Sequence, residues 1–291
     1  MMEMIDIHTH GLRDCDTRGA SPGDFLRMAR LHGSQGVGAI VPTIFSSSID
    51  EMRLDIGAAK KAMEYQREDR TAAPGLSPAK ILGVHLEGPF LNPARAGALD
   101  KESFLPAAIA SWKRLVEGFG EVVRIVTVAP ELTGATGLIE AMADMGVVVS
   151  MGHSNATYGE AEAGFRAGAR GITHVFNAMR GFHHREPGIA GFALMNPEVY
   201  VEMIADPYHL HERTIELIFA VKDPDRIIIV SDTVKGSASD DGGREVVDMQ
   251  GKLLGGSLAL TGSTRRLVQL GFDPGLVERA ARQNPARYLG L

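Results

Sequence analysis

The chain has 291 residues, of which 44% are hydrophobic. It can therefore bury a large core, and one eight-stranded α/β barrel of typically ~250 residues would use nearly all of it. The formal net charge of −6 comes from 36 acidic and 30 basic side chains, and basic residues form only short pairs such as Lys60-Lys61. This balance offers no cationic surface, so we expect neither nucleic acid nor a membrane as a partner.

The sequence shows no sign of secretion or membrane insertion. Its start lacks a basic region followed by an apolar stretch and a cleavage site, and no segment reaches the ~18 uninterrupted apolar residues of a membrane span. The single cysteine, Cys15, can form neither an internal disulfide framework nor a cysteine-rich zinc site. We therefore expect a soluble, unprocessed protein of the reducing cytoplasm.

Short apolar runs rich in β-branched residues recur along the whole chain. They begin near residues 4, 37, 81, 123, 147, 171, 199 and 227, roughly 32 residues apart, which is about one strand–helix–strand unit. Their nearly continuous apolar character is typical of strands buried on both faces. Helical patterns lie between them, at Pro22 to His32, Ile49 to Arg67, Gly137 to Met145, Tyr158 to Ala167 and Glu212 to Val221. The order predicts a (β/α)8 TIM barrel, as one domain over residues 1–291.

Local signals mark helix starts and interruptions. Ser21 before Pro22 and Ser48 before two acidic residues are typical of helix N-termini. Residues 68–80 contain several glycine, proline and serine residues, so we expect them to be the least ordered segment. Residues 235–243 are polar and follow the eighth predicted strand, which predicts a mobile loop over its end.

Candidate metal ligands follow these predicted strands. They are His8 and His10 after the first strand, Glu87 after the third, His153 after the fifth, His174 after the sixth and Asp232 after the eighth. Each has an ordinary structural explanation when taken alone, such as a hydrogen-bonded histidine or a capping carboxylate. The carboxyl ends of barrel strands converge on one cavity, so their agreement predicts a single metal centre there. Histidine and carboxylate ligands suit zinc or iron.

Other polar residues suggest roles around such a centre. Asp232 is the natural proton acceptor for water at the metal, because a carboxylate beside a cation can take a proton and return it to a leaving group. His209 could donate to a carbonyl oxygen that gains negative charge in the transition state. We expect His211 to begin the next helix. His85 lies within the same strand as Glu87, and we expect its side chain to face away from the neighbours of Glu87 in that strand.

Motifs of other enzyme classes are missing from the sequence. It has no Gly-x-Ser-x-Gly elbow, no Walker-type loop and no Gly-x-Gly-x-x-Gly, and His211-Glu212 lacks the second histidine of a zincin helix.

Several longer stretches carry a family resemblance. They are Ile5-Asp6-Ile7-His8-Thr9-His10-Gly11, His85 to Asn92, Gly152 to Thr157, Thr173 to Met179, Arg185-Glu186-Pro187-Gly188 and Ser231-Asp232. With them, the chain resembles the amidohydrolase superfamily and, within it, the N-acetylglucosamine-6-phosphate deacetylases, nearly from end to end. The Glu-Gly-Pro, Gly-His-Ser-Asn-Ala-Thr and His-x-x-Asn-Ala-Met elements are specific when found together.

The resemblance implies a role for each matching residue. Glu87, His153 and His174 would hold a divalent metal, Asp232 would act as general base and then acid, and His209 would polarise the acetyl carbonyl. Asn177, the backbone of Ala178, and Arg185 would contact the sugar phosphate, since an arginine pairs two phosphate oxygens at once. The other explanation for Arg185 is a loop salt bridge with Glu186. His8 and His10 would hold a second ion together with Glu87 and Asp232, so one or two ions are expected.

The sequence departs from the family pattern in three ways. Leu99 stands where relatives usually carry a histidine near the substrate, and Pro207 stiffens the loop that carries His209. Relatives also flank the barrel with a small β-sandwich built from both termini, and this sequence contains neither half. Either the natural protein is a barrel alone or the sequence is part of a longer chain.

These observations favour a metal-dependent deacetylase that acts on an N-acetyl amino sugar, with N-acetylglucosamine 6-phosphate as the first candidate. An unphosphorylated N-acyl compound or a cyclic amide is the alternative substrate, and Leu99 favours it. A catalytically silent metal-binding barrel is the alternative outside enzymes. In the family the phosphate arginine can act across a dimer contact, so a homodimer is a reasonable expectation.

Overall fold

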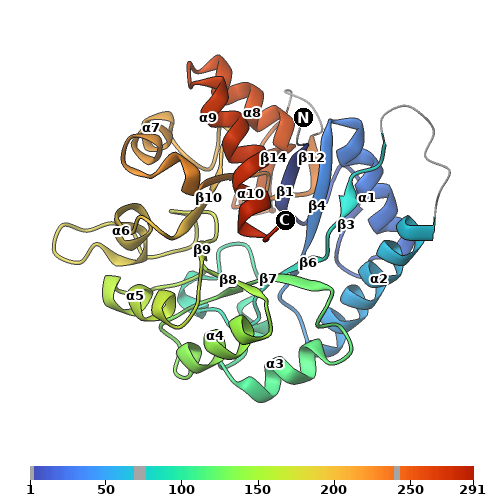
Figure 1. The fold of residues 1–291 in the computed structure, drawn as a ribbon, viewed down its shortest axis with the longest axis horizontal. Coiled ribbons are helices and arrows are strands. Elements are labelled where there is room, and N and C mark those ends of the chain that lie inside the picture. Colours follow the sequence, from blue (N-terminus) through green and yellow to red (C-terminus); the bar gives the residue numbers. More distant parts are fainter. Residues whose placement is uncertain (1–2, 69–76, 239–242) are drawn as a thin grey trace.

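Eight parallel strands form the frame of the molecule (Figure 1). In hydrogen-bonded order they are β1 (Met4–Thr9), β4 (Val37–Phe45), β6 (Val84–Glu87), β7 (Val123–Val128), β8 (Val148–Met151), β9 (Gly171–Ile172), β10 (Tyr200–Ile204) and β11 (Ile227–Val230). The computed structural model describes residues 3–68, 77–238 and 243–291. The ring closes where the backbone N–H of Asp232 donates to the carbonyl oxygen of His8 at 2.8 Å. The predicted (β/α)8 TIM barrel is confirmed.

Helices cover the outside of this ring. They are α1 (Pro22–Ser34), α2 (Ile49–Glu68), α3 (Ile109–Val116), α4 (Ala135–Asp144), α5 (Tyr158–Arg166), α6 (Gly188–Met195), α7 (Glu212–Val221) and α8 (Leu260–Gln269). The five predicted helices are present, with both ends within two residues of the prediction. Ser21 caps α1 by accepting from the backbone N–H of Asp24, and Ser48 does the same for Glu51 in α2. The short side-chain signals were therefore sufficient to locate these helix starts.

The C-terminal segment covers one end of the barrel. It contains α9 (Pro274–Glu278), a π-helical turn (Arg279–Gln283) and α10 (Asn284–Tyr288), and α10 lies over the centre of the strand ring in Figure 1. Tyr288 and Leu289 pack against inward-facing strand residues such as Ile125 and Ile228. This end is therefore closed by apolar packing.

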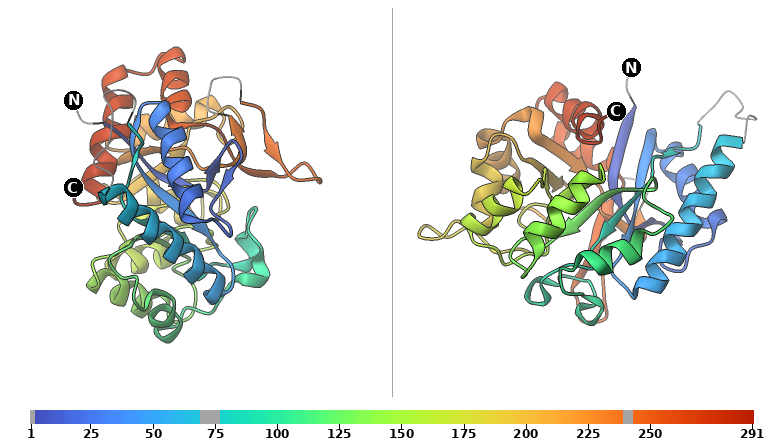
Figure 2. Two further views of the ribbon diagram at one scale, coloured as in Figure 1. Left: turned by 90° about the vertical axis from the view of Figure 1, so that its right-hand side faces the viewer. Right: turned by 60° about the horizontal axis from the view of Figure 1, so that its bottom comes forward.

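A second, smaller sheet lies at the other end. It has the order β12 (Thr233–Ala238), β14 (Leu253–Leu258) and β13 (Val246–Val247), next to the short pair β2 (Gly11–Leu12) and β3 (Cys15–Asp16). In the left view of Figure 2, the orange β14 and the turquoise segment 93–105 extend from the side opposite the C-terminus. This segment contains the 3-10 turns Pro93–Arg95 and Lys101–Ser103, and a third such turn is Pro224–Arg226.

The predicted mobile loop over residues 235–243 is wrong for residues 235–238, because they belong to strand β12, which pairs with β14 through Thr233 and Ala238. Residues 239–242 lie outside the described residues, as do residues 69–76 of the segment that we expected to be the least ordered. The third predicted strand starts near residue 81 but is divided, with β5 (Lys80–Ile81) separated from β6 by Gly83 at φ 138°.

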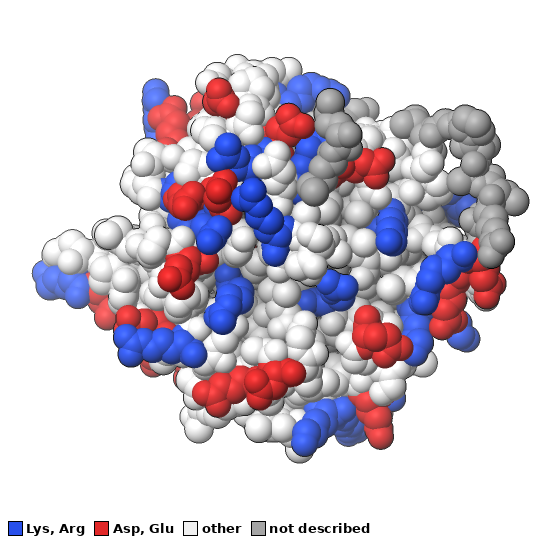
Figure 3. Space-filling model, in the orientation of Figure 1, with Lys and Arg blue, Asp and Glu red and all other residues white. Residues whose placement is uncertain are grey.

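Charged side chains are mixed on the face shown in Figure 3, where acidic and basic groups alternate without a large area of one sign. Within the described residues, no helix is long and apolar enough to cross a bilayer.

Candidate active site and metal centre

Three of the predicted site residues follow their strands with an unusual backbone conformation. His153, His174 and Asp232 each lie two residues after the end of a strand, at φ values of 47°, 29° and 49°. Residues other than glycine rarely adopt this left-handed region, and they do so mainly where the surrounding structure forces it, often at functional sites. The strand ends therefore hold these side chains in orientations that an ordinary turn would not provide.

Glu87, His153 and His174 form the first group. Oε1 of Glu87 lies 3.0 Å from Nε2 of His153 and 3.0 Å from Nε2 of His174. The two Nε2 atoms are 3.2 Å apart. All three side chains are at most 5% exposed, so the group is shielded from bulk water. The structure thus brings together three ligands from β6 and from the ends of β8 and β9.

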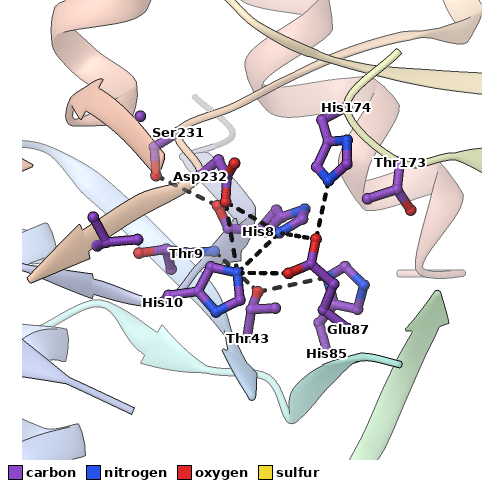
Figure 4. A network of polar contacts seen from close by, with 12 residues as sticks. His8, Thr9, His10, Thr43, His85, Glu87, Thr173, His174, Ser231 and Asp232 are labelled. Atoms are coloured by element: carbon purple, nitrogen blue, oxygen red, sulfur yellow. Dashed lines mark hydrogen bonds and ion pairs between the residues drawn. The ribbon is translucent and has the colours of Figure 1, made fainter. Parts of the chain in front are cut away.

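His8, His10 and Asp232 form the second group. Nε2 of His8 is 3.3 Å from Nε2 of His10 and 3.3 Å from Oδ1 of Asp232. Nε2 of His10 is 3.6 Å from the same oxygen of Asp232 and 3.1 Å from Oε2 of Glu87. Figure 4 shows Glu87 between this group and His174. Glu87 can therefore contribute to both groups, as a bridging carboxylate.

The hydrogen bonds of the histidines indicate what kind of ion the two groups can bind. Nδ1 of His153 must donate to the carbonyl oxygen of Arg95 at 2.9 Å, because that oxygen can only accept. A neutral imidazole that donates from Nδ1 has a lone pair at Nε2, and this lone pair faces Glu87.

The second group has the same arrangement, because Nδ1 of His8 lies 3.2 Å from the carboxylate of Glu202. A carboxylate that accepts from Nδ1 leaves the lone pair of the ring on Nε2, which lies 3.3 Å from Oδ1 of Asp232. A lone pair opposite a carboxylate is repulsive unless a cation lies between them. Both groups therefore fit a divalent cation with nitrogen and oxygen ligands.

The carboxylates differ in their proton affinity. Burial raises the pKa of Glu87, but its interactions with His153, His10 and His174 outweigh this and hold it well below its usual value. Burial, and then the charge of Glu87, raise the pKa of Asp232. The Asp232 side chain is also 13% exposed, which leaves it open to the cavity. It is therefore the carboxylate of this site that can most readily take up and return a proton.

His209 is held by Asp206 at the end of β10. Its Nδ1 lies 3.0 Å from Oδ2 of Asp206, and that oxygen also accepts from the backbone N–H of Ser257 at 2.8 Å. Burial lowers the pKa of His209, but the hydrogen bond and charge of Asp206 outweigh this and raise it. The ring is therefore stabilised in the protonated form, in which its other nitrogen is a hydrogen-bond donor.

A cavity of about 400 Å³ lies over the two groups. The predicted residues that line it are His10, Glu87, His153, His174, Asn177, Ala178, His209 and Asp232. Leu99 lines it too, and it packs there against Phe45. Arg185 does not line it: this arginine is exposed in the loop before α6, with Nη1 3.2 Å from Nε2 of His184. Glu186 accepts from the backbone of Tyr158 and Gly188, and the described residues show no Arg185–Glu186 ion pair.

Residues 4–291 match the amidohydrolase family over almost the whole chain. The chain belongs to the amidohydrolase family. These proteins are hydrolases of carbon–nitrogen bonds, so the chemistry of the site and the family agree at this level.

This amidohydrolase is similar to deacetylases of two phosphorylated amino sugars. It is 33% identical over 300 residues to an N-acetylgalactosamine-6-phosphate deacetylase of Escherichia coli O157:H7, an alignment that covers 99% of this chain and 77% of that protein. It is also 33% identical over 274 residues to an N-acetylglucosamine-6-phosphate deacetylase of Vibrio furnissii, covering 92% of this chain and 66% of that protein. The chain is therefore shorter than both relatives.

A solved structure agrees with these sequence comparisons. A variant of N-acetyl-D-glucosamine-6-phosphate deacetylase from Mycobacterium smegmatis, in complex with N-acetyl-D-glucosamine-6-phosphate, matches with a TM-score of 0.88 at 28% identity. The match covers 100% of this chain and 77% of that chain.

Some features of the amidohydrolase site were missed or misplaced by sequence reasoning. His85 does not face away from the site: its ring contacts that of His8 at 4.6 Å between centroids, and Nε2 bonds Thr127. Residues two apart on a strand share a face, so His85 and Glu87 both point into the barrel. Glu202 was missed, although an acid in the middle of a buried strand is a signal that could have found it. Lys252, which lines the cavity, had no recognisable local pattern.

Proposed function

We propose that this amidohydrolase is a metal-dependent deacetylase that converts N-acetylglucosamine 6-phosphate to glucosamine 6-phosphate and acetate. The observation that carries the proposal is the convergence of Glu87, His153 and His174 with Asp232 and His209 around one cavity. This set contains metal ligands, a proton acceptor and a hydrogen-bond donor, which are the groups that hydrolysis of an amide requires.

Glu87, His153 and His174 would hold one divalent ion, and His8, His10 and Asp232 would hold a second that shares Glu87. Zinc and iron both suit these ligands. Such an ion supplies Lewis acidity, which makes water a nucleophile near neutral pH.

Two side chains carry out the remaining steps. Asp232 takes the proton of the attacking water and then delivers it to the departing sugar nitrogen, so that the amine leaves in neutral form. His209 donates a hydrogen bond to the acetyl oxygen as negative charge develops on it. Asp206 supports this by holding Nδ1 of His209 and stabilising the protonated ring.

The sugar would lie against Asn177 and Ala178, which line the cavity. Lys252 is the cation of this lining and could meet a phosphate. Arg185 is exposed and outside the lining, so a phosphate contact from it would have to come from a second copy of the chain, as in a homodimer.

An unphosphorylated N-acyl compound is the second candidate substrate. Leu99 favours it, because this apolar side chain lines the cavity where a polar contact to the sugar or phosphate is expected. The relative that acts on N-acetylgalactosamine 6-phosphate makes that epimer the third compound to test.

The experiment is acetate release from the metal-loaded protein with each of the three compounds. We expect kcat/KM for N-acetylglucosamine 6-phosphate to exceed that for plain N-acetylglucosamine by orders of magnitude, because a phosphate site discriminates strongly against a substrate that lacks the group. Equal values would support the unphosphorylated alternative. No turnover of any N-acyl compound would contradict an enzymatic role and support a silent metal-binding barrel.

A further inference from the structure

Glu202 is a buried carboxylate that the proposed reaction does not use. It lies in the middle of β10 and is 1% exposed. Its Oε2 lies 3.2 Å from Nδ1 of His8, and among the described residues Oε1 has no hydrogen-bond partner. A carboxylate rarely occupies an interior position without a specific partner, and the ring of His8 is that partner here.

The four histidines of the site, His8, His10, His153 and His174, differ in the hydrogen-bond partner of their Nδ1 atom. Nδ1 of His153 donates to a backbone carbonyl oxygen. Nδ1 of His10 and of His174 have no hydrogen-bond partner within the described part of the chain. Among these four, only His8 has a carboxylate next to its Nδ1 atom.

A carboxylate in this position has two effects on a ligating histidine. It keeps the proton on Nδ1, so that Nε2 presents its lone pair to the metal, and it makes the ring a stronger donor. His8 belongs to the second group, because its Nε2 lies 3.3 Å from both Nε2 of His10 and Oδ1 of Asp232. The effects therefore act on the second site.

We propose that Glu202 is a positioning residue that holds His8 for a second divalent ion, so that the His8–His10–Asp232 site binds this ion tightly only when the carboxylate is present. The role rests on the metal-dependent function proposed above, but it can be tested without turnover.

The test compares wild type with Glu202→Gln, which keeps the size of the side chain and removes its charge. The new amide can also donate to Nδ1, which favours the wrong tautomer of His8. Both proteins are stripped, reloaded with zinc and assayed for zinc per chain, and each dissociation constant is measured by competition with a chelator.

We expect two ions in wild type. In Glu202→Gln we expect one ion of unchanged affinity and a second that binds about 10–100-fold more weakly. Glu202→Asp, which restores the charge with a shorter side chain, should recover part of the loss. Ser150→Ala is the matched control, because Ser150 is a buried polar residue of the barrel interior whose side chain bonds Thr173. This control should bind both ions as wild type does.

Three results would overturn the proposal: two ions of unchanged affinity in Glu202→Gln, equal weakening of both ions, or a wild type that saturates with one ion. If Glu202→Gln does not fold, the same comparison is made with Glu202→Asp, for which wild-type affinity at both sites would be the contrary result. The proposed function fails separately, since two ions in wild type without release of acetate would refute the deacetylase and leave the role of Glu202 intact.

Discussion

Asp232→Asn is the most direct test of the proposed chemistry, because it changes one oxygen to nitrogen and keeps the shape of the side chain. Asparagine cannot accept the proton of the attacking water, nor can it deliver one to the leaving nitrogen. Asp232 is not part of the first group, whose ligands Glu87, His153 and His174 contact one another directly. The first ion should therefore stay bound in the variant.

The size of the effect follows from the two proton transfers assigned to Asp232. General acid–base catalysis contributes typically ~10²–10⁴-fold to a rate. Because one side chain performs both transfers, we expect kcat to fall by at least about 10³-fold, which corresponds to about 4 kcal/mol in the barrier. The carboxylate of Asp232 also lies 3.3 Å from Nε2 of His8, so the second ion should bind more weakly.

The assay measures acetate release at saturating substrate together with zinc per chain. The control is Asp14→Asn, an equivalent change at a side chain that is 67% exposed and paired with Arg27 on the surface. A variant at position 232 that keeps its first ion and loses less than tenfold in kcat would refute the assignment of Asp232 as the proton-transfer residue. Loss of both ions would show that the division into two groups is wrong.

Three further outcomes are expected from the structure. His209→Gln should lower kcat by about 10²–10³-fold with little change in zinc content, as removal of an oxyanion donor does; wild-type kcat would exclude this role. Tyr288→Ala should lower the free energy of unfolding by about 3–5 kcal/mol in urea titrations, because a buried ring that covers the barrel end is replaced by a cavity; a loss below 1 kcal/mol would contradict the packing argument. Burial lowers the pKa of His32 from 6.5 to about 4, so the unfolded chain takes up its proton first as the pH falls. Stability that is present above pH 6.5 is then lost towards pH 4, by up to about 3 kcal/mol for this group. His32→Gln should show that much less dependence on pH than wild type in urea titrations from pH 7 to 4.5, and parallel curves would be the contrary result.

The barrel and most of the site could be predicted from the sequence for a physical reason. Each strand is a short apolar run and several helix starts carry a local cap such as Ser21, so these elements depend on neighbouring residues. In a parallel barrel every strand ends at the same rim. A residue placed just after its own strand, such as His153 or His174, is therefore near the others without knowledge of any long-range contact.

Only the tertiary structure decided the features that depend on contacts between distant segments. Glu202 and His8 are 194 positions apart, and no local pattern connects them. The pairing of β12 with β14 ordered residues 235–238, whose polar composition indicated a loop. The exclusion of Arg185 from the cavity lining likewise depends on how its loop leaves the barrel. Local sequence thus determined which residues end the strands, whereas packing across the barrel determined which distant residues contact the candidate ligands and line the cavity.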